Sequence, residues 1–373
     1  MNDIFDLMIL PSVVVSSLIA VKIFDLISPI HLPRHERNLQ IDGLRGLLAL
    51  FVFVHHASIW KGFLKTGVWE NPPSNFFTNI GQVGVSIFFM ITGYLFFTKI
   101  RNGNQEWIRL YTSRFFRLTP MFLFSFALIL FVAGEATGWK INTSYKDLFI
   151  SIARWAPFTL GGMPNINGLD KSFSINAAVT WTLVYEWFFY LSLPLIAFMM
   201  RKKVGASFAI ISFIFVCLFV IYPSTKIHII SFACGFIASL LKESKHAVEF
   251  SKKKFSSLLV LSLITFELFF FKETYNIFAL AICGISFALI CCGCSLFGAL
   301  DASIFRKMGE ATYSIYLLHG IFLYAIFRLP PAGHEINYSF ITICLAAFAI
   351  TFISCATYKL IELPFINYAA RKK

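Results

Sequence analysis

Residues 41–57 read IDGLRGLLALFVFVHHA, an apolar run that is interrupted by Arg45 and by the pair His55 and His56. Arg45 and His56 are eleven positions apart, which on an α-helix is about 20° beyond three full turns and roughly 16 Å along the axis. Both side chains are therefore expected on one helix face, whereas His55 points about 80° away. Ionisable groups inside an apolar helix are costly in lipid and usually face the bundle interior, so this spacing indicates a functional site.

The composition indicates an integral membrane protein. Of the 373 residues, 58% are hydrophobic, 14% are charged and 45 are Phe, and the mean hydropathy is +0.74. Soluble domains of this length carry far less apolar surface. We therefore predict an all-α, polytopic transmembrane helix bundle of about eleven spans. The expected spans are 5–29, 39–59, 77–99, 115–134, 179–200, 204–222, 226–241, 255–271, 275–299, 311–328 and 338–362.

Basic residues in the connections predict the orientation. Of the 32 Lys and Arg residues, 20 fall in alternate connections, which are 31–38, 99–117, 201–203, 242–254, 301–307 and the tail 371–373. By the positive-inside rule these segments lie in the cytoplasm, so the N-terminus is outside and the C-terminus inside. The first span is expected to be retained, because its leader MNDIFD is acidic where a signal peptide is basic. The net charge of +13 does not indicate nucleic-acid binding, because the basic residues are scattered over short connections.

Cysteines and loops add little chemistry. The eight cysteines fall inside expected spans, where a thiol behaves as a small apolar group. They do not predict a metal site, because no His or second Cys pair stands at ligand spacing. The longest polar connection, 135–178, contains a semi-apolar stretch at 147–160 that either lies along the outer surface or dips into the protein. Its length suggests a lid or an acceptor-binding element.

Two other apolar segments carry charged side chains. TWTLVYEWFFYL (180–191) places Glu186 among aromatic residues at a depth expected to match that of His56. A carboxylate there is costly unless it is paired or takes part in chemistry. RFFRLTP (114–120) places Arg114 and Arg117 on one face at the inner surface. Either they anchor the topology or they hold an anion.

The tenth expected span reads TYSIYLLH at 312–319 and carries Tyr313, Tyr316 and His319. A lone histidine in such a helix is as often a packed core residue as a reactive one, and the same holds for His56. Asp42, one turn before Arg45, is a candidate ion-pair partner for it. The residues alone leave these alternatives open.

Six blocks in this order resemble the integral-membrane acyltransferase-3 family, which includes O-acetyltransferases of cell-surface polysaccharides. They are IDGLRGLLALFVFVHH, GQVGVSIFFMITGYLF, RFFRLTP, TWTLVYEWFFYL, GEATYSIYLLH and IELPF. The resemblance implies a core of about ten helices, an acyl-coenzyme A donor taken from the cytoplasm, and an acceptor often presented on the far side. On this basis residues 1–38 form an extra helix and linker, 39–365 the acyltransferase core and 366–373 a basic cytoplasmic tail.

The resemblance also implies roles for individual residues. The family signature pairs an arginine and a histidine with ten residues between them, which selects Arg45 and His56 and passes over His55. The implied catalytic residues are His56 and Glu186. The implied coenzyme A ligands are Arg45, Arg114 and Arg117, and the implied substrate contacts are Trp181, Tyr313 and His319.

Two departures from the family pattern both keep a hydroxyl group. Thr182 stands for the serine of a Trp-Ser-Leu-x-x-Glu motif, and Thr92 stands for a serine before Gly93. We therefore expect the chain to keep its activity.

The charge pattern and the resemblance together suggest one mechanism. Arginines hold the phosphates of acetyl-CoA, which is a co-substrate and not a bound cofactor, and the thioester reaches His56. His56 then either deprotonates an acceptor hydroxyl, oriented by Glu186, or is itself transiently acylated. No metal is required.

The expected function is therefore O-acylation of a cell-envelope glycan in the bacterial inner membrane. The expected partners are acyl-CoA, a polysaccharide or lipid-linked glycan, and membrane lipid. A transporter or flippase of a lipid-linked sugar or organic anion is the alternative, in which the same charges form a substrate pathway. A structural subunit explains the hydrophobicity but not the buried charges.

Overall fold

The fold is helical throughout the residues that the computed structural model describes, which are 3–32, 38–103, 105–221, 226–329 and 336–371. The strand-like pairing in these residues is a single bridge between Ile166 and Leu169. The predicted all-α class is therefore confirmed. The α-helices in chain order are α1 (Asp3–Ile27), α2 (Leu39–Thr66), α3 (Asn75–Asn102), α4 (Trp107–Ala136), α5 (Tyr145–Trp155), α6 (Trp181–Met199), α7 (Ala206–Ile221), α8 (His228–Leu241), α9 (Lys245–Ser251), α10 (Lys254–Phe270), α11 (Ile277–Cys292), α12 (Ser303–Glu310), α13 (Thr312–Arg328), α14 (Phe340–Thr357) and α15 (Leu363–Arg371).

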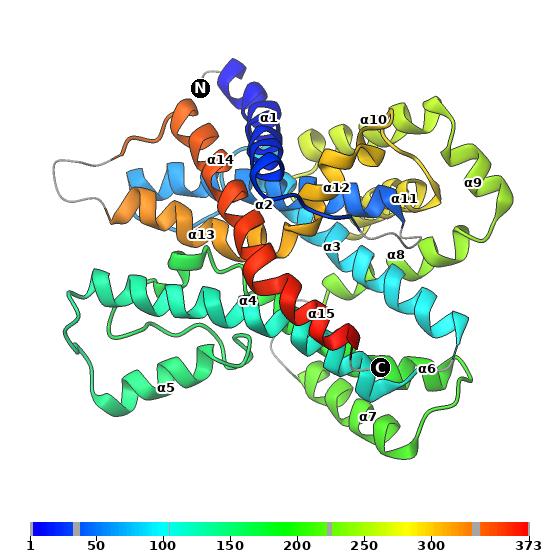
Figure 1. Cartoon of the computed structure of the whole chain (residues 1–373), viewed down its shortest axis with the longest axis horizontal. Coiled ribbons are helices and arrows are strands. Elements are labelled where there is room, and N and C mark those ends of the chain that lie inside the picture. Colours follow the sequence, from blue (N-terminus) through cyan, green and yellow to red (C-terminus); the bar gives the residue numbers. More distant parts are fainter. Residues whose placement is uncertain (1–2, 33–37, 104, 222–225, 330–335, 372–373) are drawn as a thin grey trace.

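Three short segments have other helical geometry: η1 (Ser172–Asn176) and η2 (Ala299–Asp301) are 3₁₀ turns, and η3 (Tyr358–Glu362) is a π-helical turn. The η3 turn joins α14 to α15, so these elements form one continuous stretch that crosses the front of the bundle (Figure 1).

Helix length and composition support a helical membrane protein. Six stretches in the described residues are long and apolar enough to cross a membrane: Met8–Ile27, α2, α3, α4, α6 and Phe340–Arg371. A seventh is gained if α12 and α13, which meet at a bend of 66°, form one broken span. Helices α7, α8 and α11 are apolar but shorter. Each of the eleven expected ranges overlaps a helix, but the count of eleven spans is not confirmed, because helix length alone does not decide whether a short helix crosses.

Helix α2 occupies the centre, where it packs against α3, α12 and α13. Its first turn is capped by Asn38, whose side chain accepts a hydrogen bond from the Ile41 backbone N–H. Two glycines let other backbones approach this turn. A Cβ atom on Gly43 would meet the carbonyl oxygen of Leu300, and one on Gly309 would meet that of Asp42. The close approach of α12 and η2 therefore fixes where α2 begins, and with it the position of Arg45.

The remaining helices gather on two sides of α2. Helices α8 to α11 lie together on one side, whereas α4 and α5 lie on the other (Figure 1). Helix α3 packs mainly against α2 and α8, while α4 packs against α13 and α15. Consecutive helices α3 and α4 thus belong to different halves of the bundle, and the cavity described below lies between those halves.

Helix α1 is docked on the C-terminal part of the chain and does not stand apart from the core. The Ser16 hydroxyl donates to the Cys344 carbonyl at 2.7 Å, and Lys307 pairs with Asp25 at 2.5 Å. Residues 33–37 of the expected linker and 372–373 of the expected basic tail lie outside the described residues.

The connection between α4 and α6 enters the protein just before α6. The segment from η1 to Thr180 is largely buried and contacts α13 and α4. Helix α5, which covers most of the stretch 147–160, buries only Ser151 and Trp155 and lies at the edge of the molecule (Figure 1). The part that dips inward is therefore 172–180, and α6 begins inside the protein.

Gly309→Ala tests the close contact between α12 and α2. The added methyl group meets the Asp42 carbonyl, and we expect the overpacking to cost about 1–3 kcal/mol of stability, seen as a lower midpoint of thermal unfolding in detergent. Gly62→Ala is the matched control, since a Cβ there meets nothing within 4 Å; we expect it to be neutral or stabilising by up to about 1 kcal/mol. Equal stability of the two variants would contradict the proposed packing.

Candidate functional site

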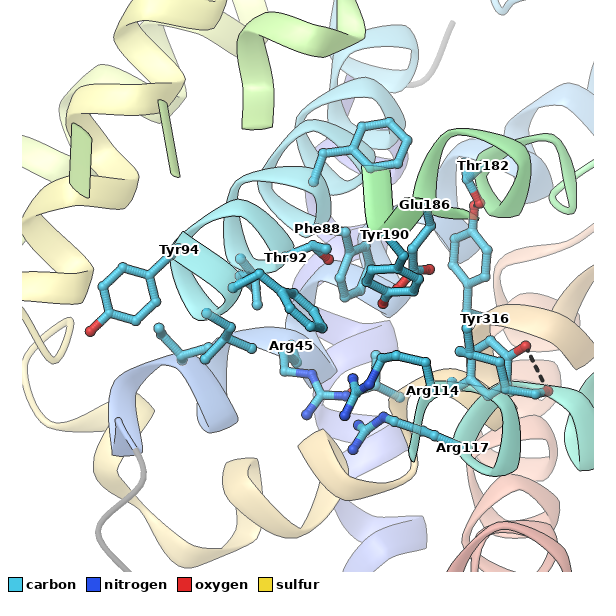
Figure 2. Close-up of a pocket in the computed structure, with 18 of the residues that line it drawn as sticks. Arg45, Phe88, Thr92, Tyr94, Arg114, Arg117, Thr182, Glu186, Tyr190 and Tyr316 are labelled. Carbon is cyan, nitrogen blue, oxygen red and sulfur yellow. Dashed lines mark hydrogen bonds between the residues drawn. The ribbon is translucent and has the colours of Figure 1, made fainter. Parts of the chain in front are cut away.

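A cavity of about 480 Å³ lies between α2, α3, α4, α6 and α13. Its walls combine apolar residues of α3 with polar side chains from the other four helices (Figure 2). The polar and aromatic lining includes Asn38, Asp42, Arg45, Phe88, Thr92, Tyr94, Phe96, Arg114, Arg117, Thr182, Glu186, Tyr190, Tyr313 and Tyr316. A mostly apolar cavity with a few convergent polar groups is the usual form of a ligand site.

Three guanidinium groups line one part of this cavity. They belong to Arg45 on α2 and to Arg114 and Arg117 on α4, and Figure 2 shows them gathered on one side, facing Glu186 and Tyr190. The Arg114 guanidinium also lies over the Phe96 ring, 5.3 Å from its centroid. Within the described residues, the half-buried Arg117 makes neither a hydrogen bond nor a salt bridge, although its guanidinium carries five donors. Such donors at a cavity wall suit an anionic ligand.

Glu186 faces these arginines across the cavity. Its carboxylate accepts a hydrogen bond from the Tyr190 hydroxyl one turn later, and Tyr190 in turn receives one from Arg114. Glu186 also interacts electrostatically with Arg117 and Arg45. The relay from Arg114 through Tyr190 to Glu186 therefore fixes the orientation of the Arg114 side chain.

The opposite end of the cavity is closed by α6 and α13. Tyr316 and Thr182 line it, and their hydroxyl oxygens are 2.9 Å apart. The Tyr316 hydroxyl also donates to the Val179 carbonyl at 3.1 Å, in the segment that dips inward before α6. The inward loop thus holds Tyr316 across the end of the cavity.

Beyond Tyr316 lies a pair of hydrogen-bonded histidines. His56 Nδ1 is 3.0 Å from His319 Nε2, and His319 Nδ1 is 3.1 Å from the Ile315 carbonyl oxygen. Because a carbonyl only accepts, His319 Nδ1 carries the proton, and in the neutral ring Nε2 accepts the proton of His56 Nδ1. The His56 ring also hydrogen-bonds the Val52 carbonyl, one turn earlier on α2. With Nδ1 as the donor to both partners, His56 Nε2 keeps its lone pair, which is the state of a base or a nucleophile.

The histidine pair lies close to the cavity but does not line it. Neither His56 nor His319 lines the cavity, and the Tyr316 ring, which does, is 6.0 Å from the His319 ring. His319 is fully buried, whereas His56 is half-buried. Tyr316 therefore lies next to both the cavity and the histidine pair.

The structure brings together some of the residues that the sequence singled out. Arg45, Arg114, Arg117, Glu186 and Tyr313 all line the cavity. His56 and His319 form the pair beyond it. Trp181 is absent from the described lining and instead contacts Tyr185 and His228.

Glu186 lines the cavity and interacts electrostatically with the three arginines. The expectation that it lies at the same depth as His56 stays a prediction. The side chain that His56 hydrogen-bonds is His319.

Sequence reasoning did not assign three further residues. Tyr190 stands four positions after Glu186, a spacing that places both on one helix face. Glu362 belongs to the quoted block IELPF; it accepts from the Ser314 hydroxyl and interacts electrostatically with Arg117 and Arg45. Its signal was an acidic residue between apolar ones. Tyr316 was noted but given no role, because nothing in the sequence shows which neighbour its hydroxyl reaches.

No cluster of three or more His, Cys, Asp or Glu residues suited to a metal ion occurs in the part of the chain that the structure describes.

A profile of the acyltransferase-3 family, described as an acyltransferase domain, matches residues 38–359. The chain belongs to this family. The match covers every cavity residue named above and both histidines, and it begins at Asn38, the N-cap of α2. The resemblance inferred from the six sequence blocks is therefore confirmed.

Curated relatives of this chain are distant. The acyltransferase MdmB of Streptomyces mycarofaciens is 26% identical over 176 residues, which are 46% of this chain and 42% of that protein. An uncharacterized protein of Haemophilus influenzae is 30% identical over 125 residues, which are 32% of this chain and 50% of that protein. The chain thus spans half or less of the length of these relatives. No solved structure matches.

A cysteine placed at Thr92 tests the accessibility of the cavity. Thr92 is half-buried and lines it, so we expect Thr92→Cys to react with a water-soluble maleimide in a background where the accessible native Cys217, Cys234 and Cys344 are replaced by Ala. Ser286→Cys is the control, because Ser286 is fully buried and lies outside the cavity lining. Equal labelling of the two positions, measured by mass spectrometry, would argue against a water-filled cavity at α3.

Proposed function

We propose that this acyltransferase is a membrane O-acyltransferase that moves an acetyl group from cytoplasmic acetyl-CoA to a hydroxyl of a cell-envelope glycan. The observation that carries the proposal is one arrangement: a cavity lined by three arginines ends beside a histidine pair whose His56 Nε2 is free to act as a base. The family match supports acyl transfer. The acetyl group, the glycan and the cytoplasmic donor are part of the proposal.

The donor fits the cavity through its charge and its length. Coenzyme A carries phosphates at one end and a thioester at the other, joined by a narrow pantetheine arm. The guanidinium groups of Arg45, Arg114 and Arg117 would bind the phosphates. Along α3 the cavity lining runs from Thr98 back to Val85, about 20 Å of helix, which gives the arm an extended path toward Tyr316.

In the proposed transfer step, His56 is the catalytic residue. The neutral imidazole takes the proton of an acceptor hydroxyl at Nε2, and the oxygen attacks the thioester carbonyl. A carbon–oxygen bond forms, the carbon–sulfur bond breaks, and the coenzyme A thiolate leaves and takes up a proton. The alternative is attack by His56 Nε2 itself, which gives an acyl-histidine that the acceptor hydroxyl then cleaves. Either route takes the thioester past Tyr316, which lines the cavity and whose ring is 6.0 Å from the His319 ring.

His319 and Glu186 act through other residues in this scheme. His319 accepts the proton of His56 Nδ1 and so fixes both its tautomer and its orientation. Glu186 holds Arg114 through Tyr190, which supports a role in positioning the phosphate ligands. Tyr313, whose hydroxyl donates to the Leu118 carbonyl, forms part of the cavity wall between α4 and α13.

The cellular setting follows from the same reasoning. The positively charged connections support a C-terminus and a coenzyme A mouth on the cytoplasmic side, and the inner membrane of a bacterium is part of the proposal. The acceptor would then approach His56 from the outer side, as a surface polysaccharide or a lipid-linked precursor.

His56→Ala tests the proposed reaction. Purified protein in nanodiscs is incubated with radiolabelled acetyl-CoA and a membrane glycolipid extract, and coenzyme A release and protein-bound label are followed. We expect turnover by the wild type and its loss by at least about a hundredfold in His56→Ala, the scale of a lost general base. His55→Gln is the control: it sits beside His56 but bonds the Phe77 carbonyl, and Gln keeps a donor there.

The label separates the two routes, since only the two-step route leaves acetyl on the wild-type protein. If the wild type shows neither binding nor turnover, the acyltransferase proposal fails and transport of an organic anion or lipid-linked sugar becomes the better account.

His319 variants test its role as a positioning residue. We expect His319→Leu to lower kcat at least about tenfold with little change in the KM for acetyl-CoA, because the donor binds on the far side of Tyr316. His319→Gln, whose side-chain oxygen accepts from His56 Nδ1, should restore part of kcat. A rise in KM with unchanged kcat, or equal activity of both variants, would contradict the assignment.

A further inference from the structure

A second, smaller cavity of about 250 Å³ opens between α3 and α4, lined by Leu95, Phe96, Lys99, Leu110, Ser113 and Arg114. Three of these residues, Leu95, Phe96 and Arg114, also line the main cavity. The small cavity, called here the annex, therefore adjoins the arginine side of the main one. It lies where α3 ends and α4 begins, at the expected cytoplasmic surface.

The annex has side chains suited to an anion, and two of them, Lys99 and Ser113, do not line the main cavity. Lys99 adds an ammonium group and Ser113 a hydroxyl, while Phe96 supplies an aromatic face. No acidic residue lines the annex. Lys99 interacts electrostatically with Arg114 and Arg109 of α4 and with Glu106, which precedes that helix. Of these, Arg109 already pairs with Glu106 at 3.7 Å.

Lys99 itself has no fixed partner. Among the described residues its side chain makes neither a salt bridge nor a hydrogen bond, whereas its backbone carbonyl accepts from Gln105 Nε2 at 2.8 Å. The turn after α3 is thus held in place while the ammonium group is left for another anion. The only basic residues in the described lining of the annex are Lys99 and Arg114.

The order of groups in coenzyme A decides what reaches the annex. The diphosphate joins the pantetheine arm directly, so it belongs with the arginines at the mouth of the main cavity. The next group outward is the ribose with its adenine and its 3′-phosphate, and it must lie against the arginine side, where the annex opens. A phosphomonoester is a good partner for a lysine and a hydroxyl, and adenine is a good partner for a phenylalanine face.

We propose that the annex binds the 3′-phosphoadenosine end of the acyl-CoA donor, with Lys99 and Ser113 on the 3′-phosphate. This inference rests on the proposed donor. It goes further by making the enzyme selective for coenzyme A over its 3′-dephospho form, and by assigning that selectivity to Lys99. A phosphate of an anionic lipid has the same chemistry, and the experiment below separates the two sources.

The test measures the dissociation constants of coenzyme A and 3′-dephospho-coenzyme A on the purified full-length protein. We expect the wild type to prefer coenzyme A by about tenfold or more, as for a charge-assisted phosphate contact. In Lys99→Gln this preference should fall to near one with the affinity for the dephospho form unchanged. Lys99→Arg should keep it. Lys245→Gln, which removes an exposed lysine at the start of α9, should match the wild type.

Three results would overturn the assignment. The first is a preference that survives in Lys99→Gln, and the second is an equal loss of affinity for both ligands. The third is stabilisation by phosphatidylglycerol that disappears in Lys99→Gln while the preference for coenzyme A stays, which would give the annex to a lipid headgroup. If neither nucleotide binds the wild type, the proposed donor fails and this assignment fails with it. Binding of both nucleotides with equal affinity would overturn only the annex.

Discussion

Guanidinium donors that face a cavity inside an apolar bundle are the constraint on which the site depends. Burying a cation is costly unless hydrogen bonds and counter-charges compensate for lost water. Here Glu186 and Glu362 both interact electrostatically with Arg45 and Arg117, and Tyr190 accepts a hydrogen bond from Arg114. Arg117 has no hydrogen-bond partner among the described residues. The positive charge of the arginines is thus only partly compensated by the protein, which suits the binding of an anionic ligand.

The backbone packing keeps those charges in place. Arg45 sits one turn after the point where η2 and α12 press against α2, a contact that only glycine permits at positions 43 and 309. Arg114 and Arg117 come from α4, which belongs to the other half of the bundle and packs against α13 and α15. The three arginines meet only because two halves of the chain close around the same space. A shift of either half would move the anion site and the histidine pair relative to each other.

The separation of the cavity from the histidines has a physical rationale. A thioester next to a basic imidazole is open to attack by water, and excluding water before the acceptor arrives prevents that side reaction. Tyr316 lies next to both the cavity and the histidine pair and is held by Thr182 and the Val179 carbonyl. Both partners belong to the beginning of α6 and to the inward loop before it. The loop whose length suggested a lid or an acceptor-binding element therefore holds a residue of the cavity wall in place.

The sequence determined the helical class, the overlap of each expected span with a helix, and the family, because apolar length and the Arg45–His56 spacing are local properties of a chain. It also assigned four charged cavity residues to the site, Arg45, Arg114, Arg117 and Glu186, since a charge in an apolar helix is conspicuous in sequence. It could not place Glu186 beside the arginines or pair His56 with His319, 263 positions away. Nor could it assign Tyr190, Glu362 and Lys99. Those relations depend on where α6 begins and on which helices α3 and α4 pack against. Only the long-range packing of helices decides this, because hydropathy fixes the length of a helix but not its depth or its neighbours.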